Sequence, residues 1–302
     1  MNFVNIGYEV TFPDVNKESI RYVIVFLEQN QKPMNREENA MQRKMPAIFI
    51  GHGSPENAFE DTVYSKQWAE IAKLLPRPKA VVAISAHWTN HTDAAASVTS
   101  AVSNEKPETI HDFYGFPEHF YDFSYGAPGS PELARRILET VQTTPVRMSN
   151  HWGLDHGAWS VLANMYPEAD IPVVQLSIDE NLPRKNMFDV GRELRMLREE
   201  GILILGSGNI VHNLRAVRWG GEPFDWAVEF DAFIRRALLE RDIQTVIDFE
   251  EHPLAQYALP TVEHFLPLLY VLGATAETED PKFFTEDIFA ASVGMRSVVF
   301  GG

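Results

Sequence analysis

Two short segments, AIFIGHG (residues 47–53) and AVVAISAHW (residues 80–88), share the pattern that decides the predicted fold. Each has a continuous apolar run, then one or two small residues, then a histidine. Continuous rather than alternating apolar residues are typical of a strand buried on both faces, as in a parallel sheet covered by helices. We therefore predict two buried strands, with His52 and His87 at their C-terminal ends.

Apolar runs and longer amphipathic stretches alternate from Met45 to the C-terminus. Strands are predicted at 47–50, 80–85, 172–177, 202–205 and 297–300. Helices are predicted between them at 63–75, 131–141, 159–165, 186–200, 226–240 and 261–273. This order implies an α/β fold with right-handed crossovers. We expect a single domain, residues 45–302, in which helices flank a mostly parallel central sheet and the site lies at the C-terminal strand ends.

Composition narrows the possible partners. The 302 residues are 45% hydrophobic and 23% charged, which is ordinary for a soluble globular protein. A formal net charge of −16 repels phosphate backbones and anionic lipid head groups, so neither nucleic acid nor a membrane is expected as a partner. The absence of cysteine excludes disulfides and cysteine-ligated metals. We expect a cytoplasmic protein, as a monomer or small homo-oligomer.

Residues 1–44 differ from the rest of the chain. Residues 32–44 (KPMNREENAMQRK) are almost wholly polar, a composition typical of linkers and disordered segments. Met45-Pro46 then opens the first predicted strand. We interpret residues 1–44 as an N-terminal extension, either disordered or preceding the native start. The alternative is a genuine strand and helix packed on the domain.

Histidines recur at the predicted strand ends. The strand at 202–205 runs into GSGNIVHNL (206–214) and brings His212 to the same edge as His52 and His87. Ligands bind at this edge of open α/β sheets because loops and helix N-termini converge there. A single histidine in such a place would more often be structural, but the repeated placement favours a metal site.

Two further histidines lie in informative contexts. His264, in PTVEHFLPLLYVLGA (260–274), is predicted near the start of a helix, and the adjacent Glu263 is an alternative ligand. A solvent-exposed first-turn histidine fits the same pattern. His156, in HWGLDHGAWSVL (151–162), follows Asp155 in a predicted loop before a helix. The nearby tryptophans either contact a planar substrate or simply pack in the core.

The motifs together resemble the bacterial 4,5-DOPA extradiol dioxygenases. These belong to the class III extradiol ring-cleavage superfamily, whose type member is protocatechuate 4,5-dioxygenase. The resemblance runs from about Met45 to the C-terminus and rests on GHGSP, SAHW, IHDFYGFP, APGSP, LDHGAW, VQLSI, GSGNIVHNL, HPL and EHFLPLLYVLGA, in that order.

The resemblance implies one divalent metal per chain, Zn²⁺ or non-haem Fe²⁺, in a strand-end pocket. It implies metal ligands among His52, His87, His212 and His264. It implies catalytic roles for His212 and His156, and substrate contacts from His156, Asp155 and His111. A glutamate completes a two-histidine, one-carboxylate triad in the wider superfamily, so Glu263 stays open as an alternative to His264. An all-imidazole site would favour zinc over iron more than that triad does.

The expected function is extradiol cleavage of a catechol such as L-DOPA, with both atoms of O₂ incorporated and a semialdehyde as product. Asp155 and Ser85 are candidates for fixing the imidazole tautomers. Two other hypotheses remain open at this point. One is a zinc-dependent hydrolase that uses a metal-bound hydroxide. The other is a non-catalytic metal-binding module of the same superfamily.

Overall fold

The computed structural model describes residues 44–90 and 99–301. The interpretation of residues 1–44 as an extension therefore lies outside the described residues, apart from Lys44. Lys44 itself is close to the domain, with its ammonium 3.6 Å from the Glu279 carboxylate.

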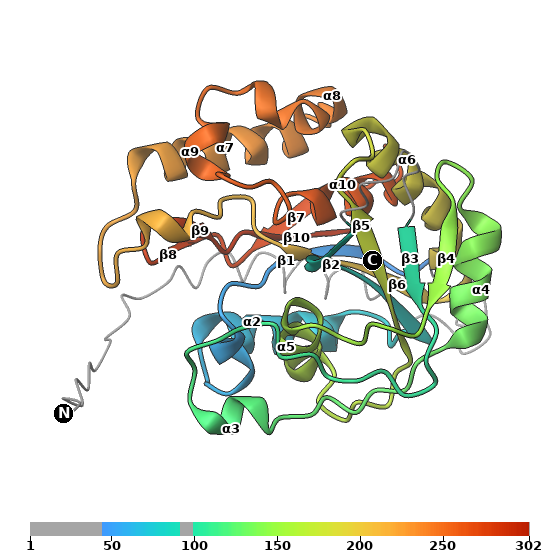
Figure 1. Ribbon diagram of the computed structural model, residues 1–302. Helices are drawn as coiled ribbons and strands as arrows, with labels where there is room; N and C mark the ends of the chain where they lie inside the picture. The colour runs from blue at the N-terminus through green and yellow to red at the C-terminus, as the bar shows by residue number, and fades with distance from the viewer. Residues whose placement is uncertain (1–43, 91–98, 302) are drawn as a thin grey trace, which may run out of the picture.

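The predicted α/β architecture with a large, mostly parallel sheet is confirmed (Figure 1). The eight strands have the order β4–β3–β5–β2–β6–β1–β10–β7. The central strands β5, β2, β6 and β1 pair in parallel, as do β3 and β4, whereas β3–β5, β1–β10 and β10–β7 are antiparallel. The strands are β1 (Ala47–Gly51), β2 (Ala80–Asn90), β3 (Thr99–Val102), β4 (Val146–Ser149), β5 (Val173–Asp179), β6 (Ile202–Gly208), β7 (Pro281–Phe284) and β10 (Ser297–Phe300).

All five predicted strands are present, and the structure adds several short ones. The added strands are β3, β4 and β7 of the main sheet, and a small separate hairpin of β8 (Ile288–Phe289) and β9 (Val293–Gly294). Edge strand β4 has no fully buried residue, so it lacks the continuous apolar run that marked the central strands. Sequence patterns alone therefore missed it.

Successive residues of the central strands face two separate cores. Val82 and Ile84 belong to the core on one face of the sheet, whereas Val81 and Ala83 belong to the core on the other. Helices α6, α7 and α10 cover the first face, and α2 and α5 cover the second (Figure 1). Burial on both faces is the reason that the runs at 47–50, 80–84 and 202–205 are apolar at every position.

The helices agree with the prediction in place but differ at some ends. Their bounds are α2 (Val63–Leu74), α3 (Glu118–Tyr121), α4 (Pro131–Thr140), α5 (His156–Met165), α6 (Arg184–Leu194), α7 (Asp225–Leu239), α8 (Ile243–Ile247), α9 (Ala255–Ala258) and α10 (Leu266–Gly273). Short 3₁₀ turns are η2 (Pro55–Ala58), η3 (Arg195–Glu200), η4 (Leu214–Ala216) and η5 (Phe249–Glu251). The predicted helix at 186–200 is thus α6 followed by η3, which ends at Gly201 with φ 92°.

The first residues of two helices differ from the prediction, and this changes where two site histidines lie. Helix α10 begins at Leu266, with Pro267 in its first turn, where proline is favoured because no backbone donor is needed there. His264 therefore lies in the turn before the helix and not in its first turn. Helix α5 begins at His156 and not at Trp159, because Asp155 caps it by accepting the backbone N–H of Ala158.

Helices α6 and α10 pack with their backbones in close contact through two glycines. A Cβ on Gly191 would lie 2.1 Å from the carbonyl oxygen of Tyr270, and a Cβ on Gly273 would lie 2.0 Å from that of Phe188. Every residue of α10 is buried, so the helix cannot move away from the sheet to make room.

We expect Gly191→Ala to lower the free energy of unfolding by about 1–3 kcal/mol, the usual cost of overpacking a tight core. Urea unfolding followed by circular dichroism measures it. Gly126→Ala is the matched control, because a Cβ there would meet no atom within 4 Å. Equal free energies of unfolding in the two variants would show that the contact between α6 and α10 has room for a side chain at position 191.

Candidate metal centre

Five imidazoles converge at the C-terminal edge of the central strands. His52 follows β1 directly, and His212 follows β6 by four residues. His87 lies within β2, at a point where the pairing with β5 shifts register between Ile84 and Thr89. Such an irregularity re-aims a side chain relative to a regular strand. His156 and His264 come from the start of α5 and the turn before α10.

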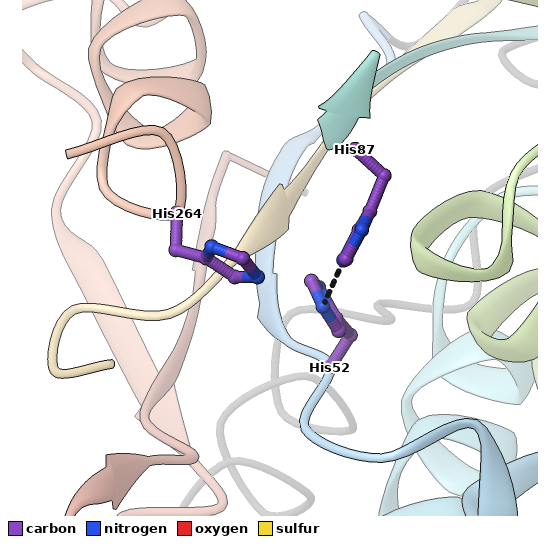
Figure 2. A group of neighbouring side chains, drawn as sticks. All are labelled: His52, His87 and His264. Atoms are coloured by element: carbon purple, nitrogen blue, oxygen red, sulfur yellow. Dashed lines mark hydrogen bonds between the residues drawn. The ribbon is translucent and has the colours of Figure 1, made fainter. Parts of the chain in front are cut away.

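Three of these rings form a compact set of ligand atoms (Figure 2). One ring nitrogen from each of His52, His87 and His264 lies within 4.8 Å of the others. The Nε2 atoms of His52 and His87 are 3.1 Å apart and face each other. All three side chains come from different elements, so only the folded chain assembles the set.

The opposite nitrogen, Nδ1, of each ring faces an oxygen. Ser207 Oγ lies 3.0 Å from His52 Nδ1, and Glu263 Oε1 lies 3.0 Å from His264 Nδ1. Asp112 Oδ2 lies 3.0 Å from His87 Nδ1. Carboxylates only accept, and Ser207 donates its own proton to the carbonyl of Gly157. Each Nδ1 therefore carries the proton, and each Nε2 presents a lone pair.

This arrangement fits a divalent metal. Two lone pairs 3.1 Å apart repel unless a cation or a proton lies between them. Neutral imidazole nitrogens with fixed tautomers are the form in which histidine binds metals. A three-imidazole set suits Zn²⁺ and other first-row divalent ions. His52, His87 and His264 can thus hold one metal ion.

Burial sets the protonation of the cluster. The pKa of His52 and the pKa of His264 lie well below the ordinary value of 6.5, first because burial disfavours the charged ring and then because neighbouring imidazoles repel it. Burial also lowers the pKa of His212 to about 4. Burial alone would lower the pKa of His87, but the contact with Asp112, together with the negative charges of Asp155 and Glu263, outweighs burial and raises this pKa. A proton on His87 therefore competes with a metal for the same position.

His156 and His212 flank the three-histidine set without joining it. The His156 ring centroid is 3.9 Å from that of His87. The His212 ring is stacked on His264, with centroids 3.4 Å apart and planes 11° from parallel, and its ligand nitrogen groups with Glu263 and His264. His212 was predicted as a ligand or a base, and this position leaves it beside the three converging nitrogens.

All five histidines line a cavity of about 430 Å³. Its remaining walls are largely apolar and come from several segments of the chain. The lining residues include Phe113, Tyr114, Phe116, Leu214, Val217, Trp219 and Phe289. Its volume falls in the range of small-molecule sites, and apolar walls with a few convergent polar groups are typical of them.

Two residues expected to contact substrate are placed elsewhere. The His111 ring points to the carbonyl oxygen of Phe123, with Nε2 3.0 Å away, and it is not among the cavity-lining residues. Asp155 is fully buried, where it caps α5 and bonds to Gln175. Both side chains are already used by the protein's own polar groups, so neither is presented to the cavity.

Asp112 and Ser207 are the site residues that the sequence patterns missed. Asp112 lies in the motif IHDFYGFP, where only the neighbouring His111 was predicted to belong to the site. Ser207 lies in GSGN, a sequence that by itself indicates no more than a weak phosphate-binding turn. A signal was present for Ser207, because it follows a buried strand run directly at the edge where the histidines collect. Ser85 was a candidate for the same role, and it accepts the backbone N–H of His87 rather than a ring proton.

Fold and site together define a class of protein, an α/β domain whose strand-end histidines can hold a divalent metal. Residues 45–301 match the family model of the catalytic LigB subunit of aromatic ring-opening dioxygenase. The chain belongs to this family of metal-dependent dioxygenases, which confirms the predicted family and enzyme class.

Two relatives and one solved structure match most of the chain. It is 45% identical over 269 residues to the 4,5-DOPA dioxygenase extradiol of Escherichia coli K12, covering 85% of this chain and 95% of that protein. It is 39% identical over 254 residues to the 4,5-DOPA dioxygenase extradiol of Beta vulgaris, covering 81% and 90%. An uncharacterised E. coli K12 protein of known crystal structure has a TM-score of 0.73 and 41% identity, covering 85% of this chain and all of that one.

Within residues 44–90 and 99–301, the helices are too short or too polar for any of them to cross a membrane.

We expect the choice between His264 and Glu263 as ligand to be visible in Zn²⁺ affinity. His264→Ala removes a converging nitrogen and should weaken binding by more than about 100-fold. Glu263→Gln keeps an oxygen that accepts from His264 Nδ1, so it should cost no more than about 10-fold. Competition with a chromophoric chelator measures both, and His119→Ala, at an exposed site, is the control. A larger loss in Glu263→Gln than in His264→Ala would make Glu263 the ligand.

We expect the metal-free protein to lose stability as pH falls from 7.5 to 5.5. Groups whose folded pKa is lowered stabilise the protein fully above the unfolded value of about 6.5 and lose this contribution below it. Four buried histidines act in this direction: His52, His156, His212 and His264. The raised pKa values of His87 and Asp155 act in the opposite direction.

The net loss should be about 1–3 kcal/mol, because each lowered group contributes at most about 1.4 kcal/mol per pH unit. Urea unfolding of the metal-free protein at the two pH values measures it. Unchanged or greater stability at pH 5.5 would contradict the burial of neutral imidazoles.

Proposed function

We propose that the protein is an extradiol dioxygenase that opens the ring of a catechol such as L-DOPA with O₂. The observation that carries the proposal is the convergence of one ring nitrogen from each of three imidazoles in a cavity that two further imidazoles also line. The family is one of ring-opening dioxygenases, and four relatives of this chain carry the name 4,5-DOPA dioxygenase extradiol.

We assign His52, His87 and His264 as the metal ligands and Fe²⁺ as the catalytic ion. When bound there, a redox-active divalent metal supplies the electron transfer that allows O₂ to react with the aromatic ring. Zn²⁺ fits the same three nitrogens, but it has no redox chemistry of its own. Glu263 then orients His264 instead of binding, as carboxylates behind ligating histidines commonly do.

The two flanking histidines supply proton transfer. A catechol must lose its phenolic protons as its two oxygens bind at the centre, and the ring-opened product regains a proton. Burial lowers the pKa of His212 to about 4 and also lowers the pKa of His156. Both rings are therefore uncharged at neutral pH, and each has a nitrogen that can accept a proton. Positioned acid–base groups of this kind contribute roughly 10²–10⁴-fold in rate.

The cavity walls position the ring and exclude water. Phe113 lies against His156, with ring centroids 5.6 Å apart in an edge-to-face arrangement, on one side of the cavity. Val217, just after η4, and Phe289, at the end of β8, line the same cavity. Aromatic and aliphatic walls favour a planar apolar ring and leave its hydroxyl groups to the polar imidazole cluster.

We expect protein reconstituted anaerobically with Fe²⁺ to form a yellow ring-opened product from L-DOPA once O₂ is admitted. The rate is followed by absorbance, with oxygen uptake equal to one O₂ per catechol, since both oxygen atoms enter the product. His212→Ala should lower kcat by about 10²–10⁴-fold.

Zinc-loaded protein is the metal control, and His151→Ala, at an exposed position, is the variant control. Absence of product from L-DOPA, caffeate and protocatechuate with Fe²⁺ bound would reject the proposal. Wild-type turnover in His212→Ala would remove His212 from the mechanism while leaving the activity in place.

A further inference from the structure

Asp112 lies in a loop segment whose backbone is fixed against the start of helix α5. The amide of Ile110 donates to the carbonyl of Leu154 over 2.7 Å, and the indole N–H of Trp159 donates to the carbonyl of Ile110 over 2.9 Å. On the other side of Asp112, Phe113 packs edge-to-face on His156. These contacts hold the Asp112 carboxylate between two histidines.

The carboxylate contacts both rings at once. Its Oδ1 is 3.0 Å from His156 Nδ1 and also accepts the backbone N–H of His156 over 2.9 Å. Its Oδ2 is 3.0 Å from His87 Nδ1, a close contact that is not aligned as a full hydrogen bond. The Asp112 side chain is only 15% exposed, so water competes little for these oxygens.

Each contact favours one tautomer. An ionised carboxylate has no proton to donate and repels a nitrogen lone pair, so a proton on the Nδ1 atom that faces it is favoured. The Nε2 atom of the same ring then presents its lone pair. For His87 this lone pair faces the Nε2 of His52, among the converging ligand nitrogens. For His156 it leaves Nε2 as an acceptor in a ring that lines the cavity.

The neighbouring carboxylates have other partners. Asp155 bonds to Gln175 and caps α5, and Glu263 bonds to the ring of His264. Asp112 is therefore the carboxylate that meets both His87 and His156.

We propose that Asp112 is a positioning residue for the reaction, and that its one carboxylate sets the tautomers of a metal ligand and of an acid–base histidine together. The proposal rests on the proposed function for the role of His156. Its geometric content, protonated Nδ1 atoms on His87 and His156, does not depend on turnover.

The direct test is long-range ¹H–¹⁵N NMR of the imidazoles in the metal-free protein, with peaks assigned by single histidine variants. In the wild-type protein, both His87 and His156 should carry a proton on Nδ1. Asp112→Asn replaces two acceptor oxygens by one oxygen and one NH₂ donor, so at least one ring should move its proton to Nε2. The matched control is Asp122→Asn, the same change at an exposed residue ten positions later.

Two further measurements separate positioning from a merely structural role. Zn²⁺ affinity, measured with the metal alone, should fall by about 10–100-fold in Asp112→Asn, as for other groups that orient ligating histidines. With Fe²⁺ and L-DOPA, kcat should fall by more than about 100-fold while KM changes little, because a wrong tautomer disables proton transfer rather than substrate binding.

A wild-type His87 or His156 ring whose Nδ1 is unprotonated overturns the proposal, and this result needs no variant to fold. Asp112→Asn with unchanged tautomers and unchanged Zn²⁺ affinity also overturns it. Expected NMR and Zn²⁺ results with no catechol turnover in the wild-type protein would reject the proposed function instead. The two failures are therefore distinguishable.

Discussion

The site depends on one constraint, which is that the Nδ1 atom of every converging imidazole faces a protein oxygen about 3 Å away. Ser207, Asp112 and Glu263 occupy the Nδ1 sides of His52, His87 and His264. Burying several imidazoles together disfavours their charged forms, and the lowered pKa values of His52 and His264 record this cost. The facing oxygens favour neutral rings that carry the proton on Nδ1. Such rings present their Nε2 lone pairs to a common point, where a metal ion can bind.

The fold makes this arrangement possible by allowing backbones to approach closely around the cluster. A Cβ on Gly208 would lie 2.0 Å from the carbonyl oxygen of His264, and a Cβ on Gly157 would lie 2.4 Å from Ser85 Oγ. The amide of Asn209 also donates to the His264 carbonyl over 2.8 Å. The turn that carries His264 is thus hydrogen-bonded directly to the end of β6. The glycine at position 208 of GSGN is explained by this close packing and not by phosphate binding.

The chemistry follows from the contrast between the two parts of the cavity. One wall is a cluster of polar rings with controlled protonation, and the others are aromatic and aliphatic. A planar substrate with adjacent hydroxyl groups matches both parts, whereas an ester or amide gains little from the aromatic walls. Three imidazoles converge here, rather than the two histidines and one carboxylate of the triad that the resemblance left open, and Glu263 lies behind the ring of His264.

The sequence by itself determined the fold class and the residue types of the site, because buried parallel strands and strand-end histidines leave local patterns in the chain. His52, His87, His212, His264 and His156 could all be named from those patterns and the family resemblance. Short edge strands such as β4, the start of α10 and the turning of His111 and Asp155 toward protein groups could not, since they depend on partners far along the chain. Asp112 meets His156 across 44 residues, and Ser207 meets His52 across 155. Only the tertiary structure decided which acceptor faces which ring, because a tautomer is set by a contact in space and leaves no periodic trace in the sequence.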